Sequence, residues 1–87
     1  MQKNLDEIKS TIKTYVIERY LKPSEEKDLT NSTPLISGGI IDSISTMQLI
    51  SFLEKEFHFE FQAHEVDRDN LDSIDIIANF VLSKISG

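Results

Sequence analysis

Hydrophobic residues recur at helical spacing in three stretches of the chain, and segments rich in polar and turn-forming residues separate them. In the first stretch, one helical face would hold Leu5, Ile8, Ile12, Tyr15 and Val16. Asn4 and Glu7 are spaced as a capping pair at its start, and Pro23 ends the helix a residue or two earlier. In the last stretch, a helix over residues 72–85 would bury Ile74, Ile77, Phe80, Val81 and Ile85. We expect Asp72 to cap this helix and Asp75 to add a carboxylate to its first turn.

The middle stretch predicts a helix from residue 42 or 43 to about residue 57, because Asp is a good N-cap and neither Gly nor Pro interrupts it. At about 100° per residue, its core face would hold Leu49, Ile50, Leu53 and Phe57. Ile44 precedes Leu53 by nine residues, which places it roughly half a turn away, and Met47 also lies nearer the exposed side. Two large apolar side chains in such positions either cover the neighbouring loop or meet a partner, and both readings stay open.

Residues 22–42 contain two prolines and two glycines among many polar residues, which predicts a long ordered loop. A loop of this length inside a compact domain usually has a functional reason. Residues 57–61 alternate as a strand would, but a lone strand cannot form a sheet, so we expect an extended segment anchored by its phenylalanines. A short helical turn is expected around residues 64–68. The predicted fold is all-α, a single domain over residues 1–87: a small four-helix bundle of three main helices and one short one.

Composition narrows the possible functions. The chain has 87 residues, of which 39% are hydrophobic and 28% charged, as in a folded soluble protein. Its net charge of -6 disfavours nucleic acid and anionic membranes and favours protein partners with basic patches. Cysteine is absent, which excludes disulfides, a thiolate nucleophile and a cysteine metal site. No apolar run resembles a signal peptide or a membrane span, so we expect a cytoplasmic protein without membrane insertion.

The tripeptide Asp-Ser-Ile occurs twice, at residues 42–44 and 72–74. Ser73 is explained by the start of the last helix alone. Ser43 differs, because Gly38-Gly39 and a long loop precede it and the helix that follows turns Ile44 and Met47 outward. A phosphate ester on Ser43 would lie at a helix N-terminus, where free N–H groups and the helix dipole favour negative charge. We therefore expect Ser43 to carry the chemistry.

Other kinds of site fit less well. A serine hydrolase needs a base, but neither His58 nor His64 lies within a Gly-x-Ser-x-Gly motif. The same two histidines are six residues apart without a cysteine or a further histidine, which is not a metal-binding pattern. Gly38-Gly39 lacks the Gly-Lys-Ser/Thr sequence of a phosphate-binding loop and is expected only to permit a turn.

The stretch from Gly39 to Phe57, Gly-Ile-Ile-Asp-Ser-Ile-Ser-Thr-Met-Gln-Leu-Ile-Ser-Phe-Leu-Glu-Lys-Glu-Phe, resembles the acyl and peptidyl carrier protein family. The resemblance implies that Ser43 receives 4'-phosphopantetheine from coenzyme A, transferred by a separate phosphopantetheinyl transferase. It also implies that Asp42 assists this magnesium-dependent transfer. The protein would then be no enzyme but a carrier of acyl groups as thioesters, and its reactive thiol would come with the prosthetic arm, which explains the missing cysteine.

The type of carrier is indicated by finer features of the resemblance. Fatty-acid carriers typically have acidic residues two and five positions after the modified serine, where this chain has Ser45 and Gln48. Thr46-x-Gln48-Leu49, and Glu65-Val-Asp-Arg68 followed by Asp72, are instead similar to stand-alone D-alanyl and other aminoacyl carrier proteins. This implies a monomer that serves an adenylating or acyl-activating ligase and downstream acyl-using enzymes, and that docks on them through Ile44, Met47, Gln48 and Glu54. The alternatives are a specialised fatty-acid or polyketide carrier and, outside the carriers, an unmodified helical protein-interaction module.

Overall fold

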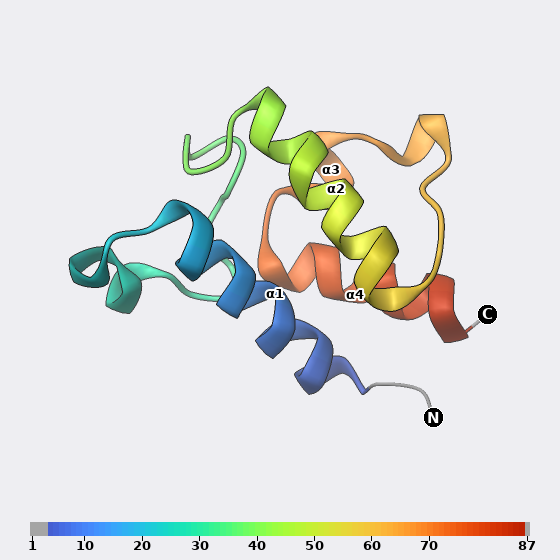
Figure 1. Ribbon diagram of the computed structural model, residues 1–87, viewed down its shortest axis with the longest axis horizontal. Helices are drawn as coiled ribbons and strands as arrows, with labels where there is room; N and C mark the ends of the chain where they lie inside the picture. The colour runs from blue at the N-terminus through green and yellow to red at the C-terminus, as the bar shows by residue number, and fades with distance from the viewer. Residues whose placement is uncertain (1–3, 87) are drawn as a thin grey trace.

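The computed structural model describes residues 4–86, apart from the side chain of Glu26, and its regular structure over that range is entirely helical (Figure 1). In chain order it contains α1 (Leu5–Tyr20), the 3-10 helix η1 (Pro23–Asp28), α2 (Ser43–Phe57), the 3-10 helix η2 (Ala63–Glu65), α3 (Arg68–Leu71) and α4 (Ile74–Ser86). The other three α-helices pack against the last one, since α1, α2 and the short α3 all contact α4 (Figure 1). The expected small all-α bundle is confirmed.

Both helix starts and the end of α2 lie where the sequence predicts them, and α1 ends at Tyr20, one residue earlier than expected. Asn4 Oδ1 accepts a hydrogen bond from the Glu7 backbone N–H (2.8 Å) at the start of α1. Asp42 Oδ1 does the same for the Ser45 N–H (2.7 Å) at the start of α2. The second helix ends at His58, which adopts the left-handed conformation (φ 57°) that commonly terminates helices.

The long loop before α2 is shorter than predicted, because its first part winds into the 3-10 helix η1. Pro23 is the first residue of this helix, a position that suits its fixed φ and its missing N–H. The Lys22 N–H is held by Glu25 Oε1 (2.9 Å), so a side chain caps the turn. The expected single turn near residues 64–68 is likewise resolved into two short helices, η2 and α3.

The start of the last helix differs from the prediction. Here α4 begins at Ile74, two residues later than expected, and Ser73 caps it by accepting a hydrogen bond from the Ile76 N–H to its Oγ (3.1 Å). The carboxylate of Asp72 does not cap α4, because it binds the loop that leads to α2. The predicted capping role of Asp72 is therefore wrong, and Ser73 fills it.

The hydrophobic core confirms the helical faces. All four predicted core residues of α2 are buried, whereas 73% of Ile44 and 56% of Met47 is exposed. In α4, Ile74, Ile77 and Val81 are buried as expected, while Phe80 and Ile85 are only partly buried. Ala78, which the pattern did not single out, is fully buried. Each large aliphatic side chain buried in this way contributes about 1.5–3 kcal/mol to folding.

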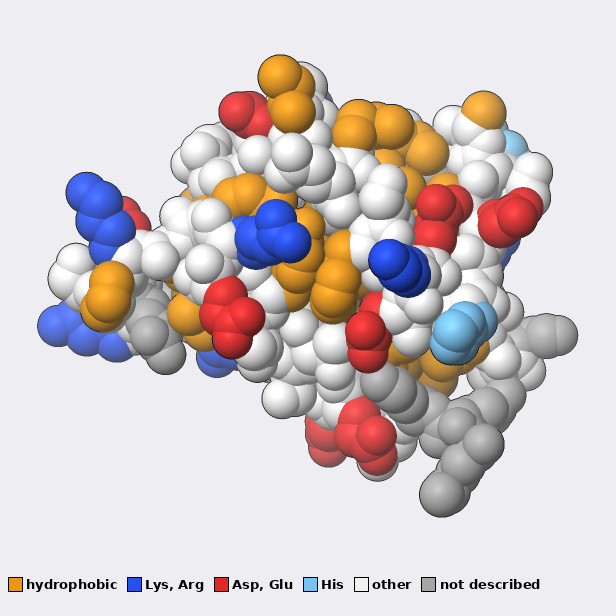
Figure 2. Space-filling model, in the orientation of Figure 1, with side chains coloured by type: hydrophobic (Ala, Val, Ile, Leu, Met, Phe, Trp, Pro, Cys, Tyr) orange, Lys and Arg blue, Asp and Glu red, His pale blue; other side chains and the backbone are white. Residues whose placement is uncertain are grey.

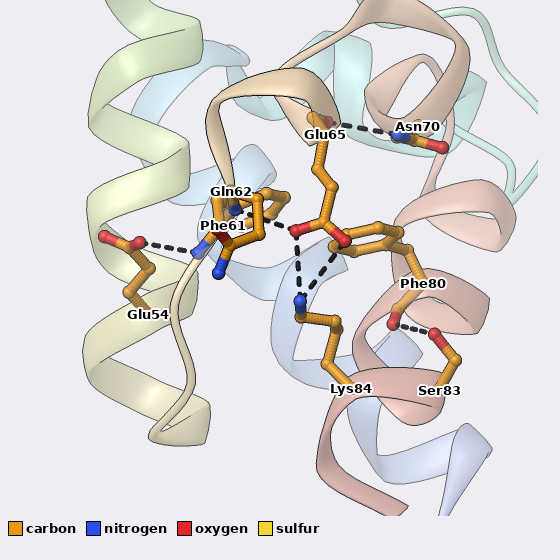
Figure 3. Close-up of polar contacts among 8 residues, drawn as sticks. All are labelled: Glu54, Phe61, Gln62, Glu65, Asn70, Phe80, Ser83 and Lys84. Atoms are coloured by element: carbon orange, nitrogen blue, oxygen red, sulfur yellow. Dashed lines mark hydrogen bonds and ion pairs between the residues drawn. The ribbon is translucent and has the colours of Figure 1, made fainter. Parts of the chain in front are cut away.

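Polar contacts fasten the extended segment between α2 and η2 onto the bundle (Figure 3). Glu65 accepts hydrogen bonds from the Gln62 N–H (2.8 Å) and from Lys84 Nζ (3.0 and 3.2 Å). These two contacts, the Gln62 N–H first and Lys84 second, lower the pKa of Glu65. The Phe61 ring stacks on Phe80 with 5.1 Å between centroids, as the predicted anchoring by phenylalanines requires. The segment that leads to α3 is thereby held in place.

Candidate functional site

Ser43 is the first residue of α2, and its side chain is exposed. Asp42, the cap, is also exposed, and its carboxylate accepts the Ser45 N–H rather than pointing freely to solvent. The hydrogen bonds from the Ser45 backbone and, second, from the Ser45 hydroxyl lower the pKa of Asp42. Asp42 is therefore ionised at neutral pH, and a hydroxyl beside it lies at the positively polarised end of a 15-residue helix.

The end of α1 holds the first turn of α2. The Tyr20 hydroxyl donates a hydrogen bond to the Ser45 carbonyl oxygen at 3.3 Å. Burial, followed by the hydrogen bond with Tyr15, raises the pKa of Tyr20 to about 12. The hydroxyl thus keeps its proton at neutral pH and remains a donor, which ties the N-terminus of α2 to the bundle.

Two adjacent glycines are needed in the loop before Ser43, for different reasons. A Cβ on Gly38 would lie 2.3 Å from the Pro34 carbonyl oxygen, a backbone atom that cannot move aside. Gly39 adopts φ +81°, a left-handed conformation that other residues rarely accept. The turn is closed by hydrogen bonds from the Gly39 N–H to Ile36 O (3.1 Å) and from the Ile41 N–H to Leu35 O (2.9 Å). The prediction that the glycine pair permits a turn is confirmed.

Asp72 binds the same loop from the other side. Its Oδ1 accepts hydrogen bonds from the N–H groups of Ile36 (2.8 Å) and Ser37 (2.9 Å), and its Oδ2 accepts one from the Ser37 hydroxyl (2.6 Å). Partial burial alone would raise the pKa of Asp72, but the Ser37 hydroxyl and the two backbone donors outweigh it and keep that pKa below its ordinary value. The loop before Ser43 is therefore bound to an ionised carboxylate at the α3–α4 junction.

An open groove of about 210 Å³ lies beside Ser43. Its other walls come from three separate parts of the chain: Ile36, Thr46, Val66, Asp67, Arg68 and Leu71. Sequence reasoning missed Ile36, Val66 and Leu71 as parts of this site. Their signal would have been hydrophobic residues next to turns, which by itself does not distinguish a groove wall from an ordinary core anchor.

The structure brings together most, but not all, of the residues predicted for docking. Ile44, Met47 and Gln48 are exposed within the first two turns of α2, near Ser43. Hydrophobic side chains stand out on the upper edge of the molecule where this helix starts (Figure 2). Glu54 lies apart from these three residues, about 16 Å from Ser43 along the axis of α2. Its Oε2 accepts the Phe61 N–H (2.8 Å), so this carboxylate also fixes the segment that follows α2 (Figure 3).

Comparison with known proteins adds no assignment: no protein-family model matches the chain, and a search of curated proteins gives no significant match. Within residues 4–86, no group of three or more His, Cys, Asp or Glu side chains is placed to hold a metal ion. In the same part of the chain, none of the helices has the length and apolar character needed to cross a membrane.

Proposed function

We propose that the protein is an acyl carrier, which holds acyl or aminoacyl groups as thioesters on a 4'-phosphopantetheine arm attached to Ser43. The observation that carries this proposal is the exposure of the Ser43 hydroxyl at the first position of α2. The surroundings fit a phosphate-linked arm, because the helix N-terminus favours the phosphate charge and an open groove begins at the same residue. When bound, the arm supplies the thiol that this chain lacks.

The residues around Ser43 present the hydroxyl without activating it. Asp42 is a weak base, since its pKa is lowered and its carboxylate is engaged with Ser45. His58 lies at the opposite end of α2, about 22 Å along the axis, and cannot reach the hydroxyl. The base that removes the Ser43 proton would therefore come from a transferase. This division of labour suits a protein that is modified and carried from enzyme to enzyme.

Ile44 and Met47 would provide the apolar part of the docking surface, because both are exposed on the helix that starts at Ser43. Binding of these side chains by an enzyme would bring the tethered cargo to its active site and raise the local cargo concentration. We further propose that the protein serves a dedicated adenylating or acyl-activating ligase, which loads its cargo. The alternative is a specialised fatty-acid or polyketide carrier.

Intact mass spectrometry tests the attachment site. Coexpression with a broad-specificity phosphopantetheinyl transferase should add one prosthetic group to the wild type and to Ser73→Ala, and none to Ser43→Ala. Modification of Ser43→Ala would move the site elsewhere. Absence of the added mass from every variant would support the unmodified interaction module instead.

Loading experiments test the type of cargo. The modified protein is offered amino acids and fatty acids with matched ligases, and the thioester product is measured by mass. We expect aminoacylation; efficient fatty acylation without any aminoacylation would reject the first choice and favour the fatty-acid carrier.

A further inference from the structure

The second Asp-Ser-Ile tripeptide contacts the loop that precedes the first one. Besides the three hydrogen bonds to its carboxylate, Asp72 accepts the Leu35 N–H on its backbone oxygen (2.6 Å). Three residues further on, the Asp75 N–H donates to the Asn31 carbonyl oxygen (2.9 Å). The α3–α4 junction therefore binds the loop at two places, and most of these bonds converge on one side chain.

These contacts determine where the turn into α2 begins. Ile36, whose N–H is bound by Asp72, lines the groove beside Ser43. The carbonyl oxygens of Leu35 and Ile36 accept the bonds that close the glycine turn, and Asp42 follows that turn directly. A shift of residues 35–37 would therefore move both a wall of the groove and the start of the helix that presents Ser43.

We infer that Asp72 is a positioning residue for the Ser43 site: its carboxylate holds the loop at Ile36 and Ser37, and so sets the presentation of the hydroxyl to the modifying enzyme. The inference rests on the proposed carrier function. It assigns to Asp72 a role in recognition by the transferase, although Asp72 lies far from Ser43 in the sequence and outside the exposed surface of α2.

A carboxylate suits this position because it accepts several hydrogen bonds at once. Its two oxygens satisfy two neighbouring N–H groups and one hydroxyl, and bonds to an ionised acceptor are stronger than neutral ones. Asn at position 72 would keep one oxygen for the two N–H groups, and its amide could donate to the Ser37 hydroxyl. Ala would leave all three loop donors without this acceptor. Rescue by Asn is therefore the expected signature.

The test combines transferase kinetics with hydrogen exchange on the unmodified protein. For Asp72→Ala, the KM of the carrier in phosphopantetheine transfer should rise about tenfold while kcat stays within about twofold of wild type, because the hydroxyl is misplaced before docking rather than altered chemically. Backbone amides of residues 36, 37, 39 and 41 should exchange faster, while those in the middle of α1 keep their protection. Asp72→Asn should have a KM and loop exchange rates close to those of the wild type.

Asp69→Ala is the matched control, since it removes a charge from the neighbouring α3 but no bond to the loop. It should change neither KM nor exchange in residues 36–41. If Asp72→Ala does not fold, Ser37→Ala, which removes only the 2.6 Å hydroxyl contact, should show the same pattern in weaker form. Wild-type KM and wild-type loop exchange in folded Asp72→Ala, or in Ser37→Ala where that variant must replace it, would overturn the inference.

These experiments distinguish a failure of the proposed carrier function from a failure of the role inferred for Asp72. If the wild type accepts no phosphopantetheine, the carrier function is wrong, and the presentation of Ser43 to a transferase falls with it. If the wild type is modified normally but Asp72→Ala behaves like it, only the role of Asp72 is wrong. A uniform rise in exchange over the whole chain, with KM unchanged for the folded fraction, would also count against positioning, because it indicates a purely structural residue.

Discussion

The two Asp-Ser-Ile tripeptides have the same sequence but opposite surroundings. Ser43 and Ile44 are exposed, whereas Ser73 is 6% exposed and Ile74 is fully buried. The difference lies in where each helix begins: α2 starts at the serine, and α4 starts one residue later, at the isoleucine. One residue turns a helix by about 100°, so the shift moves the serine from a presented position to a capping one.

The shift arises because the aspartates of the two tripeptides have different hydrogen-bond partners. Asp42 caps its own helix and leaves Ser43 outside the capping bond. Asp72 is occupied by the loop at Ile36 and Ser37, so Ser73 must cap α4 in its place. A short motif is therefore no guide to function until the partner of its acidic residue is known.

The largest test of this contrast exchanges each isoleucine for aspartate. Ile74→Asp should cost about 4 kcal/mol or more, because it places a charge among fully buried side chains, and a loss of that size is enough to unfold a marginally stable small domain. Ile44→Asp should leave thermal stability nearly unchanged and instead impair modification and loading, since Ile44 is exposed. Thermal unfolding followed by circular dichroism compares the stabilities of the two variants, and intact mass spectrometry measures the modification. A marked loss of stability in Ile44→Asp would place that side chain in the core.

A second comparison is made within α2. Leu53→Ala removes a fully buried side chain and should destabilise the protein by about 2–5 kcal/mol. Met47→Ala, on the exposed side of the same helix, should change stability by less than about 0.5 kcal/mol. Urea unfolding gives both values, and equal costs would contradict the assignment of faces.

Replacing the two serines by alanine should produce a smaller difference in stability than the preceding pairs. Ser73→Ala removes the acceptor of the Ile76 N–H and should cost about 1 kcal/mol, as is typical of a lost helix cap. Ser43→Ala should be neutral within about 0.5 kcal/mol. If both changes cost the same in urea unfolding, the two serines have the same structural role after all.

The smallest expected effect is that of pH on the two aspartates. Because the pKa values of Asp42 and Asp72 are both lowered by folding, their stabilising contribution is fully present above the unfolded-state pKa of about 3.9. It is lost as the pH falls through the lower folded-state pKa. Asp42→Asn and Asp72→Asn should each lose less stability than wild type between about pH 6 and about pH 2 in urea titrations. Unchanged acid sensitivity in both variants would contradict this assignment.

Sequence periodicity predicted the local features well. The bounds of α1 and α2 and the outward position of Ile44 depend on caps and spacings within a few residues, which a sequence displays directly. The role of Asp72 could not be read in this way, because its partners lie 35 and 36 residues earlier. The groove was missed for the same reason, since Ile36, Val66 and Leu71 are brought together only by the packing of the helices.

The span of the Asp72 contacts has a consequence for biosynthesis. During translation, residues 35–43 leave the ribosome before residue 72 does, so the loop and Ser43 emerge without the carboxylate that fixes them. Contacts between distant parts of a chain form only after both parts are available, and closing the intervening segment costs entropy. An enzyme that selects the finished geometry would pass over nascent chains, and the order of synthesis would then act as a check that only completed molecules are modified.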